Sequence, residues 1–545
     1  MMPESGIHVT ELILVTLVAF VAILAALAQR MKLPYPIVLV LGGLVLSFVP
    51  IFPNISLRPD VVFLVILPPL LFASALQTSW SGFKYNLVSI SMLAFGLVAF
   101  TVAGVAVVVH LFLPGFDLRT GAVLGAVVCT TDAIAIAAIA KRIGLPHSML
   151  EVIEGESLMN DATGLLALEF SVALVVSGTI PTVWHGIGQL LILVLGGALS
   201  GLAVGKIVQF FQTPVEGSAL QILVSLVTPY FAYLLGEGVH TSGVLATVAC
   251  GLYLGRKRSS TLTSEARLDE QAVWNTVEFA LNGGVFILIG LQLPTVLPRM
   301  KPYNWPHLLG AAVFVSLLLI ALRMIWMFPG SHIAWLIRHR LLKQKSNQPN
   351  TRQLIVLGWS GLRGVLTLAA ALSLPETTDA GTPFPHRDMI LFLAFSVILV
   401  TLVGQGLTLP VLTRKLGVCE PDKINAEETK ARRALLTAAM QRLGRMMEDE
   451  RQLPEPSLTH LGTLEAIGRF YQERVAALDL KDDHDHDGAG NAPLDVRIYA
   501  DLSGQVRSSE REELYRLQSA GAIGDDTLRR LERELDLLDL RYPSA

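Results

Sequence analysis

Long apolar segments recur through residues 1–415 of this 545-residue chain and limit what it can fold into. A helix of about 18–25 apolar residues crosses the roughly 30 Å of hydrocarbon in a bilayer. Runs such as 190–195 are apolar on every side, unlike the alternating strands of a membrane barrel. We therefore predict an all-α polytopic membrane protein. Its thirteen predicted spans lie near 9–29, 35–51, 61–78, 86–113, 120–140, 149–177, 184–211, 218–236, 240–255, 270–293, 306–329, 352–374 and 388–413.

Charge divides the chain into two predicted domains. Residues 1–415 form the membrane body, whereas residues 416–545 hold 18 Lys and Arg against 26 Asp and Glu. This acidic tail is expected to be mostly helical, with a solvated linker at 481–492. Its charge argues against nucleic acid as a partner, because binding phosphates requires clustered basic residues. Three scattered cysteines indicate neither a disulfide framework nor a zinc site.

The distribution of basic residues between loops predicts the orientation of the body. With the amino terminus outside, the inner loops hold fourteen Lys and Arg and the outer loops five. The positive-inside rule then places the tail in the cytoplasm after thirteen crossings. The amino terminus has no positive region before its first apolar run, so that run reads as a retained helix. We predict a multi-pass protein of the cell (inner) membrane, with lipid as its surroundings.

A few charged residues fall deep inside the predicted spans. The acids are Asp132, Glu156 and Asp161, and the most informative bases are Arg323 and Arg363. A charge at the centre of a membrane helix costs about 2.5–3.5 kcal/mol on insertion scales, so each one needs a partner, water or a proton. These residues are therefore functional candidates.

The motif GESLMND, at 155–161, places polar residues on one side of the sixth span. Ser157 and Asp161 lie four positions apart, as do Glu156 and Asn160, so each pair stacks one turn apart on a helix. We predict that Asp161 and Ser157 offer oxygens to an ion, while Asn160 and Glu156 hold neighbouring backbone. The alternative is a polar stripe that joins helices, but three acids within eight residues exceed that need.

Two other spans carry sequences that are poor continuous helices. Thr130, Thr131 and Asp132 can bond to nearby backbone, and GWSGLRG at 358–364 has three glycines around Arg363. Two such broken helices, an odd number of spans apart, indicate inverted-topology repeats whose breaks cross near the membrane centre. Asp132 is expected to offset the positive helix ends at this crossing, and Arg363 the negative ones.

Together these motifs resemble the sodium/hydrogen exchanger family of cation:proton antiporters. The resemblance extends in order over nearly all of residues 9–414 and includes VILPPLLFASAL, GVHTSGVLATVACGLYLG, FILIGLQL and GLRG. It implies a thirteen-helix body with a six-helix core domain and a dimerisation domain, usually assembled as a homodimer. It also implies an ion site made of Thr131, Asp132, Glu156, Ser157, Asn160 and Asp161, with Arg323 and Arg363 in structural roles at the helix crossing.

The resemblance implies a transporter that needs no cofactor. We predict exchange of Na⁺ or Li⁺ for H⁺, with Asp161 as the carrier and Asp161, Ser157 and Thr131 as oxygen ligands of the alkali cation. The Asn160–Asp161 pair resembles the branch of the family that exchanges ions electroneutrally. K⁺/H⁺ exchange and a cation channel are the alternatives, and no ordered nucleophile and base support an enzyme. A regulator of the tail is a further candidate partner.

Overall fold

A computed structural model of the chain describes residues 5–48, 58–177, 183–215, 217–300, 304–344, 350–418, 421–453, 458–486, 510, 512–516 and 531. In these ranges every regular element is a helix, and a single bridge between Thr377 and Pro383 is the only extended pairing. The all-α prediction is therefore confirmed. The chain divides into two compact units, Met1–Glu420 and Pro421–Ala545.

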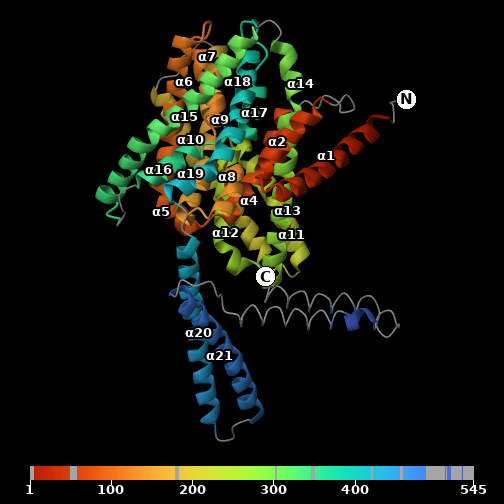
Figure 1. Cartoon of the computed structure of the whole chain (residues 1–545), viewed down its shortest axis with the longest axis vertical. Coiled ribbons are helices and arrows are strands. Elements are labelled where there is room, and N and C mark those ends of the chain that lie inside the picture. The colour runs from red at the N-terminus through yellow and green to blue at the C-terminus, as the bar shows by residue number, and fades with distance from the viewer. Residues whose placement is uncertain are drawn as a thin grey trace. The chain divides into compact units, whose positions relative to one another are not determined.

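The first unit is a bundle of packed helices (Figure 1). Its first elements are α1 (Ser5–Arg30), α2 (Tyr35–Leu46), α3 (Pro59–Val61), η1 (Val62–Ile66), α4 (Leu67–Gln77), α5 (Trp80–Ser91), η2 (Met92–Leu97), α6 (Val98–Phe112), α7 (Leu118–Val128), α8 (Ala133–Ile143) and α9 (His147–Val176). The following ones are α10 (Val183–Gln212), α11 (Ser218–Gly238), α12 (Gly243–Thr261), α13 (Ser264–Leu291), α14 (Leu293–Val296), η3 (Leu297–Met300), α15 (Trp305–Leu336), η4 (Ile337–Leu341), α16 (Thr351–Trp359), α17 (Val365–Leu372), α18 (Arg387–Leu399), η5 (Val400–Gln405) and α19 (Gly406–Leu416).

Short polar side chains set the beginnings of several of these helices. The Asp117 carboxylate accepts a hydrogen bond of 2.8 Å from the backbone N–H of Thr120, at the start of α7. Ser242 and Thr263 cap α12 and α13 in the same way. Such caps satisfy backbone groups that the helix itself leaves free. They fix where each apolar segment begins.

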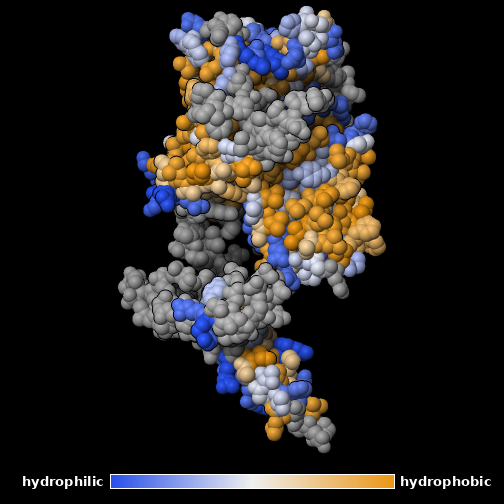
Figure 2. All heavy atoms as spheres, turned by 90° about the vertical axis from the view of Figure 1, so that its right-hand side faces the viewer, coloured by the Kyte–Doolittle hydropathy of each residue, from blue (hydrophilic) through white to orange (hydrophobic). Residues whose placement is uncertain are grey.

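Nine helical segments within the described residues are long and apolar enough to cross a membrane. The other four predicted spans correspond to the shorter apolar stretches Val15–Arg30 of α1 and Tyr35–Leu46 (α2), to α12 and to the broken pair α16 and α17. The count of thirteen crossings stays a prediction. Figure 2 shows hydrophobic side chains gathered on the surface of this unit, and α10 exposes a row of them: Leu191, Ile192, Leu195 and Leu199. An apolar surface of this kind suits lipid rather than water.

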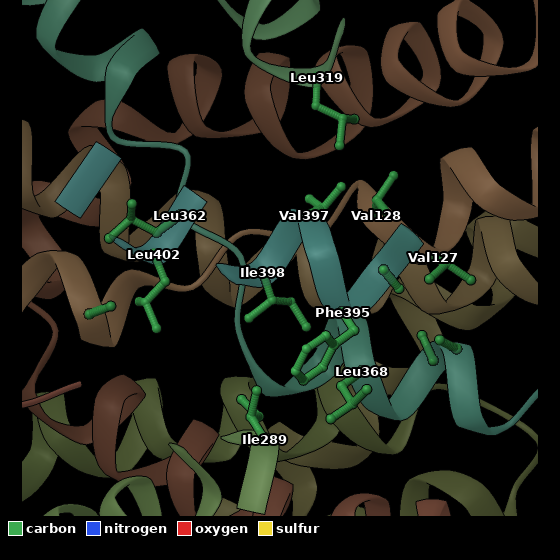
Figure 3. Close-up of a cluster of buried hydrophobic side chains, with 14 of the residues drawn as sticks. Val127, Val128, Ile289, Leu319, Leu362, Leu368, Phe395, Val397, Ile398 and Leu402 are labelled. Carbon is green, nitrogen blue, oxygen red and sulfur yellow. The ribbon is translucent and has the colours of Figure 1, made fainter. Parts of the chain in front are cut away.

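Apolar side chains surround the two interrupted helix pairs. Val128 ends α7, Leu362 lies between α16 and α17, and Ile398 and Leu402 come from α18 and η5. All four are fully buried in one cluster (Figure 3). Close packing of this kind stabilises helix association in lipid, where water drives it little. The breaks are therefore held in a tightly packed surrounding.

The second unit contains the helical hairpin of α20 (Pro421–Arg451) and α21 (Leu458–His486), which Figure 1 shows packed together. α20 ends at Arg451, before Pro454, because proline is excluded from helix interiors. α21 continues through His486, into the first half of the linker predicted at 481–492. A solvated charge run does not by itself stop a helix, and the first glycine, Gly488, comes later. The rest of that linker and nearly all of the residues after it lie outside the described ranges.

Candidate ion-binding site

The two interrupted helix pairs meet at their breaks. α7 and α8 are separated by residues 129–132, and α16 and α17 by residues 360–364. The backbone N–H of Asp132 donates to the carbonyl of Leu362 at 2.8 Å, and the hydroxyls of Thr130 and Thr367 are 3.3 Å apart. The predicted interruptions are confirmed, and the backbone bond from Asp132 to Leu362 joins one break to the other.

Asp132 lies at two helix beginnings at once. Its Oδ1 accepts a hydrogen bond of 2.9 Å from the N–H of Ile134 in the first turn of α8. Its carboxylate also borders Gly364, the residue before α17, where an added Cβ would overlap Asp132 Oδ2 and lie 2.7 Å from its Cγ. A negative side chain at helix amino termini is favourable. The contact supports the structural role predicted for Asp132.

The approach of Asp132 to Gly364 gives a testable prediction. Gly364→Ala should destabilise the folded protein by about 1–3 kcal/mol, the usual cost of overpacking, and should lower transport, because the new methyl group displaces the Asp132 carboxylate. Thermal unfolding in detergent and flux in liposomes measure the two effects. Gly404→Ala is the matched control, since a Cβ there meets no atom within 4 Å. Equal stability of the two variants would contradict the prediction.

The GESLMND motif lies on α9 and faces the first break. The Ser157 hydroxyl donates to the Thr131 carbonyl at 2.8 Å and accepts from the N–H of Ala133 at 3.2 Å. Asn160 Nδ2 donates to Thr131 Oγ1 at 2.6 Å. The sequence predicted Ser157 as an oxygen ligand of the ion, but in the structure its hydroxyl bonds to the backbone of the break. The interruption of α7 and α8 is thus fixed in place by polar residues of α9.

Asp161 differs from the other acids of the motif. Its side chain is only 8% exposed, and it has no hydrogen-bond or oppositely charged partner among the described residues. It borders a cavity of about 60 Å³, whose walls include Thr131, Asp132 and Ser157. Asn160 Oδ1 is also buried, and it accepts no hydrogen bond from any of the described residues. Asp161 therefore offers an uncommitted carboxylate beside a small cavity, whereas Asn160 is not one of the residues that line it.

Glu156 and Arg323 form a buried ion pair between α9 and α15. Arg323 Nη2 donates to Glu156 Oε2 at 2.8 Å, and Nη1 donates to Oε1. Arg323 also donates through Nη2 to the carbonyl of Leu357 in the last turns of α16, at 3.2 Å. Glu156 in turn accepts from Thr131 Oγ1 at 3.3 Å. One ion pair therefore ties α9, α15, α16 and the first break together.

Arg363 has a different environment from the one predicted for it. Its backbone N–H donates to Thr401 Oγ1 at 3.2 Å. Its guanidinium Nε and Nη1 atoms are buried, with no hydrogen-bond partner in the described ranges. The arginine that donates to the free carbonyl end of α16 is Arg323 rather than Arg363. Sequence reasoning had no means of choosing between them, because both are basic residues within neighbouring spans.

A larger cavity of about 480 Å³ adjoins the Asp161 cavity and was not predicted from the sequence. The two share lining residues of α4 and α8, namely Ser74, Ala133 and Ile134. The acids of the larger cavity come from α9 and α13: Glu151, Glu154 and Glu278. It lies where α2 begins and α4 ends. These helix ends are on the side of the predicted basic loops. The larger cavity therefore places negative charge beside the Asp161 cavity, and negative charge of this kind attracts cations.

A third cavity, of about 390 Å³, lies between α9 and the helices α10, α11 and α12. It carries Glu169, Glu237 and His240, residues at the opposite ends of their spans from the basic loops. Between this cavity and Asp161 lies an apolar cluster that includes Leu158, Ala162, Tyr233, Val244 and Leu366. The Asp161 cavity therefore shares a wall with the acidic cavity, whereas apolar side chains separate it from the third cavity.

Comparisons with known proteins match this architecture. The family model described as sodium/hydrogen exchanger, transmembrane, matches residues 16–415. An uncharacterized Na⁺/H⁺ exchanger of Mycobacterium tuberculosis H37Rv is 31% identical over 547 residues, covering 99% of this chain and 97% of that protein.

Two further matches are an antiporter named for several alkali cations and a solved structure with a similar fold. The sodium, potassium, lithium and rubidium/H⁺ antiporter of Bacillus pumilus is 31% identical over 436 residues, covering 77% of this chain and 64% of that protein. The solved structure of the sodium proton antiporter MjNhaP1 from Methanocaldococcus jannaschii has a TM-score of 0.61 at 19% identity, covering 75% of this chain and 98% of that one. From this fold, the matched residues and the full-length relatives it follows that the chain belongs to the sodium/hydrogen exchanger family, a family of membrane antiporters.

Proposed function

We propose that the protein exchanges Na⁺ or Li⁺ for H⁺ through competition of the two cations for Asp161. The observation that carries this proposal is that Asp161 is buried beside a cavity without a hydrogen-bond or charged partner in the described part of the chain, whereas Glu156 is bound to Arg323. A proton and an alkali cation each neutralise one carboxylate, so binding of one requires release of the other. Carboxylate and amide oxygens are hard donors that suit a hard cation.

The same geometry supports alternating access. The Asp161 cavity adjoins the acidic cavity and is closed on the other side by the apolar cluster around Leu158 and Tyr233. Movement of α9 and the crossing against α10–α12 would close the first route and open the second. A bare carboxylate in an apolar surrounding is costly, so only the neutralised forms should move. The expected assembly is a homodimer in the cell membrane with the basic loops and the tail in the cytoplasm.

Exchange of one monovalent cation for one proton moves no net charge. Asn160 occupies the position beside the carrier, and its amide donates to Thr131 rather than adding a second carboxylate. Asp132, the other acid on the cavity wall, is engaged by the amino terminus of α8. We therefore propose electroneutral exchange, in which one site carries one positive charge in each direction.

Flux in proteoliposomes tests the function. An imposed Na⁺ gradient should change the internal pH at an unchanged rate when the membrane voltage is clamped at different values. Na⁺, Li⁺ and K⁺ are tested separately. K⁺ is the second candidate because the Bacillus pumilus relative is named for potassium as well as sodium. Cation current without proton movement would instead identify a channel.

A further inference from the structure

A cavity of about 190 Å³ lies away from the exchange site, at the basic-loop ends of α5, α9, α15 and α16. It shares no lining residue with the Asp161 cavity or with the acidic cavity. Its polar walls come from four separate helical segments and include Asn86, Ser148, Ser331 and Gln353. Arg338, from η4, is the charged residue that lines it. The proposed exchange mechanism uses none of these groups.

Arg338 is a buried cation without a counter-charge in the described part of the chain. It is 9% exposed, and its Nη2 atom has no hydrogen-bond partner there. Its other contacts are uncharged: Nε donates to Gln344 Oε1 at 3.3 Å, and the guanidinium lies 4.2 Å from the centre of the Tyr85 ring. A buried charge of this kind is costly unless an anion compensates it. Arg323, by contrast, has Glu156.

Two helix amino termini border the same cavity. Ser148 and Met149, in the first turn of α9, line it, and that helix has no side-chain cap. Asn350 and Gln353, at the start of α16, line it as well. Asn350 caps that helix by accepting a hydrogen bond of 3.0 Å from the N–H of Arg352, so part of the α16 amino terminus is already satisfied. Helix amino termini present free N–H groups and a partial positive charge, which favour anions. The amino termini of α9 and α16 and the guanidinium of Arg338 all contribute positive charge to this cavity.

We propose that this cavity binds a phosphate-type oxyanion, held by Arg338 and the amino termini of α9 and α16. Guanidinium groups bind phosphate oxygens through paired hydrogen bonds. Glu151 does not line the cavity, but its Oε2 accepts a hydrogen bond of 3.3 Å from Nδ2 of the wall residue Asn86. The oxyanion comes from a lipid headgroup or from free phosphate. Exposed apolar residues of α15 and η4, Phe328, Ile333 and Leu341, offer contact to lipid chains beside it.

Thermal unfolding of the purified full-length protein tests the proposal in two arms. One arm adds sodium phosphate to the protein in detergent, against sodium chloride of equal ionic strength. The other compares vesicles of phosphatidylcholine alone with vesicles that also contain phosphatidylglycerol. The unfolding midpoint should rise by about 2 °C or more in at least one arm, because a ligand that binds the folded state stabilises it. The arm that responds identifies the source of the oxyanion.

Variants assign the response to the cavity. Arg338→Gln should abolish the rise, whereas Arg340→Gln, which removes an exposed charge two positions away, should retain it. If Arg338→Gln does not fold, Gln353→Glu replaces it as the test variant. This change places a carboxylate in the cavity wall while Arg338 stays, and it should also abolish the rise because the carboxylate repels an oxyanion. The proposal is overturned if neither arm stabilises the wild-type protein, or if the variant that folds responds as the wild type does. Ion exchange is not the readout, so this outcome is independent of the function proposed above.

Discussion

Asp161→Asn should abolish cation-dependent proton flux and leave a folded protein. The amide is nearly isosteric with the carboxylate, but it cannot hold the negative charge for which the cation and the proton compete. Asp161 accepts no hydrogen bond and forms no ion pair in the described residues, so the substitution breaks no contact that holds the fold. We expect flux in liposomes at the background of protein-free vesicles, with the elution volume of the purified protein unchanged.

A matched substitution separates the carrier from acids in general. Asp60→Asn changes an exposed acid whose partner is the equally exposed Arg58, and it should exchange ions at the wild-type rate. Sodium binding to the purified protein provides a second readout, because it should release protons from the wild type and none from Asp161→Asn. Proton release that persists in the variant would show that another group carries the exchange.

Local sequence chemistry was enough to find the crossing and the acids beside it. Thr130, Thr131 and Asp132 predicted a break because their side chains compete with helical hydrogen bonds, and α7 ends at Val128, two residues before Thr130. The glycines around Arg363 predicted the second break for a related reason. The polar side of α9 followed from residue spacing alone, and Ser157 and Asn160 do face the first break together.

Contacts between segments far apart in the chain could not be predicted from the sequence. Glu156 and Arg323 are 167 positions apart, and no local pattern says that they meet. The same limit hid the acidic cavity, because Glu151 and Glu154 lie on α9 and Glu278 on α13, which are far apart in the sequence. Ser157 was given to the ion because a hydroxyl one turn from Asp161 suits a cation. Its preference for the backbone of the break depends on how α8 approaches α9.

Glu156→Gln, which breaks the buried pair with Arg323, should strongly destabilise the folded protein. Glu156→Gln leaves a buried guanidinium without its counter-charge, and such a loss costs about 3–5 kcal/mol. We expect a lower yield of folded protein and a clear fall in the unfolding midpoint in detergent. Arg299→Gln is the control, because its partner Asp388 is about half exposed and such pairs contribute about 0–1 kcal/mol.

The double variant Glu156→Gln, Arg323→Gln distinguishes an ion pair from two independent effects. Removing both charges leaves no unpaired ion, so the double variant should be destabilised by much less than the sum of the two single changes. The remaining loss measures the hydrogen bonds from Arg323 to the Leu357 carbonyl, which glutamine replaces only in part. Additive losses in this cycle would mean that the two side chains act separately, and α9 would then be joined to α15 and α16 by apolar packing alone.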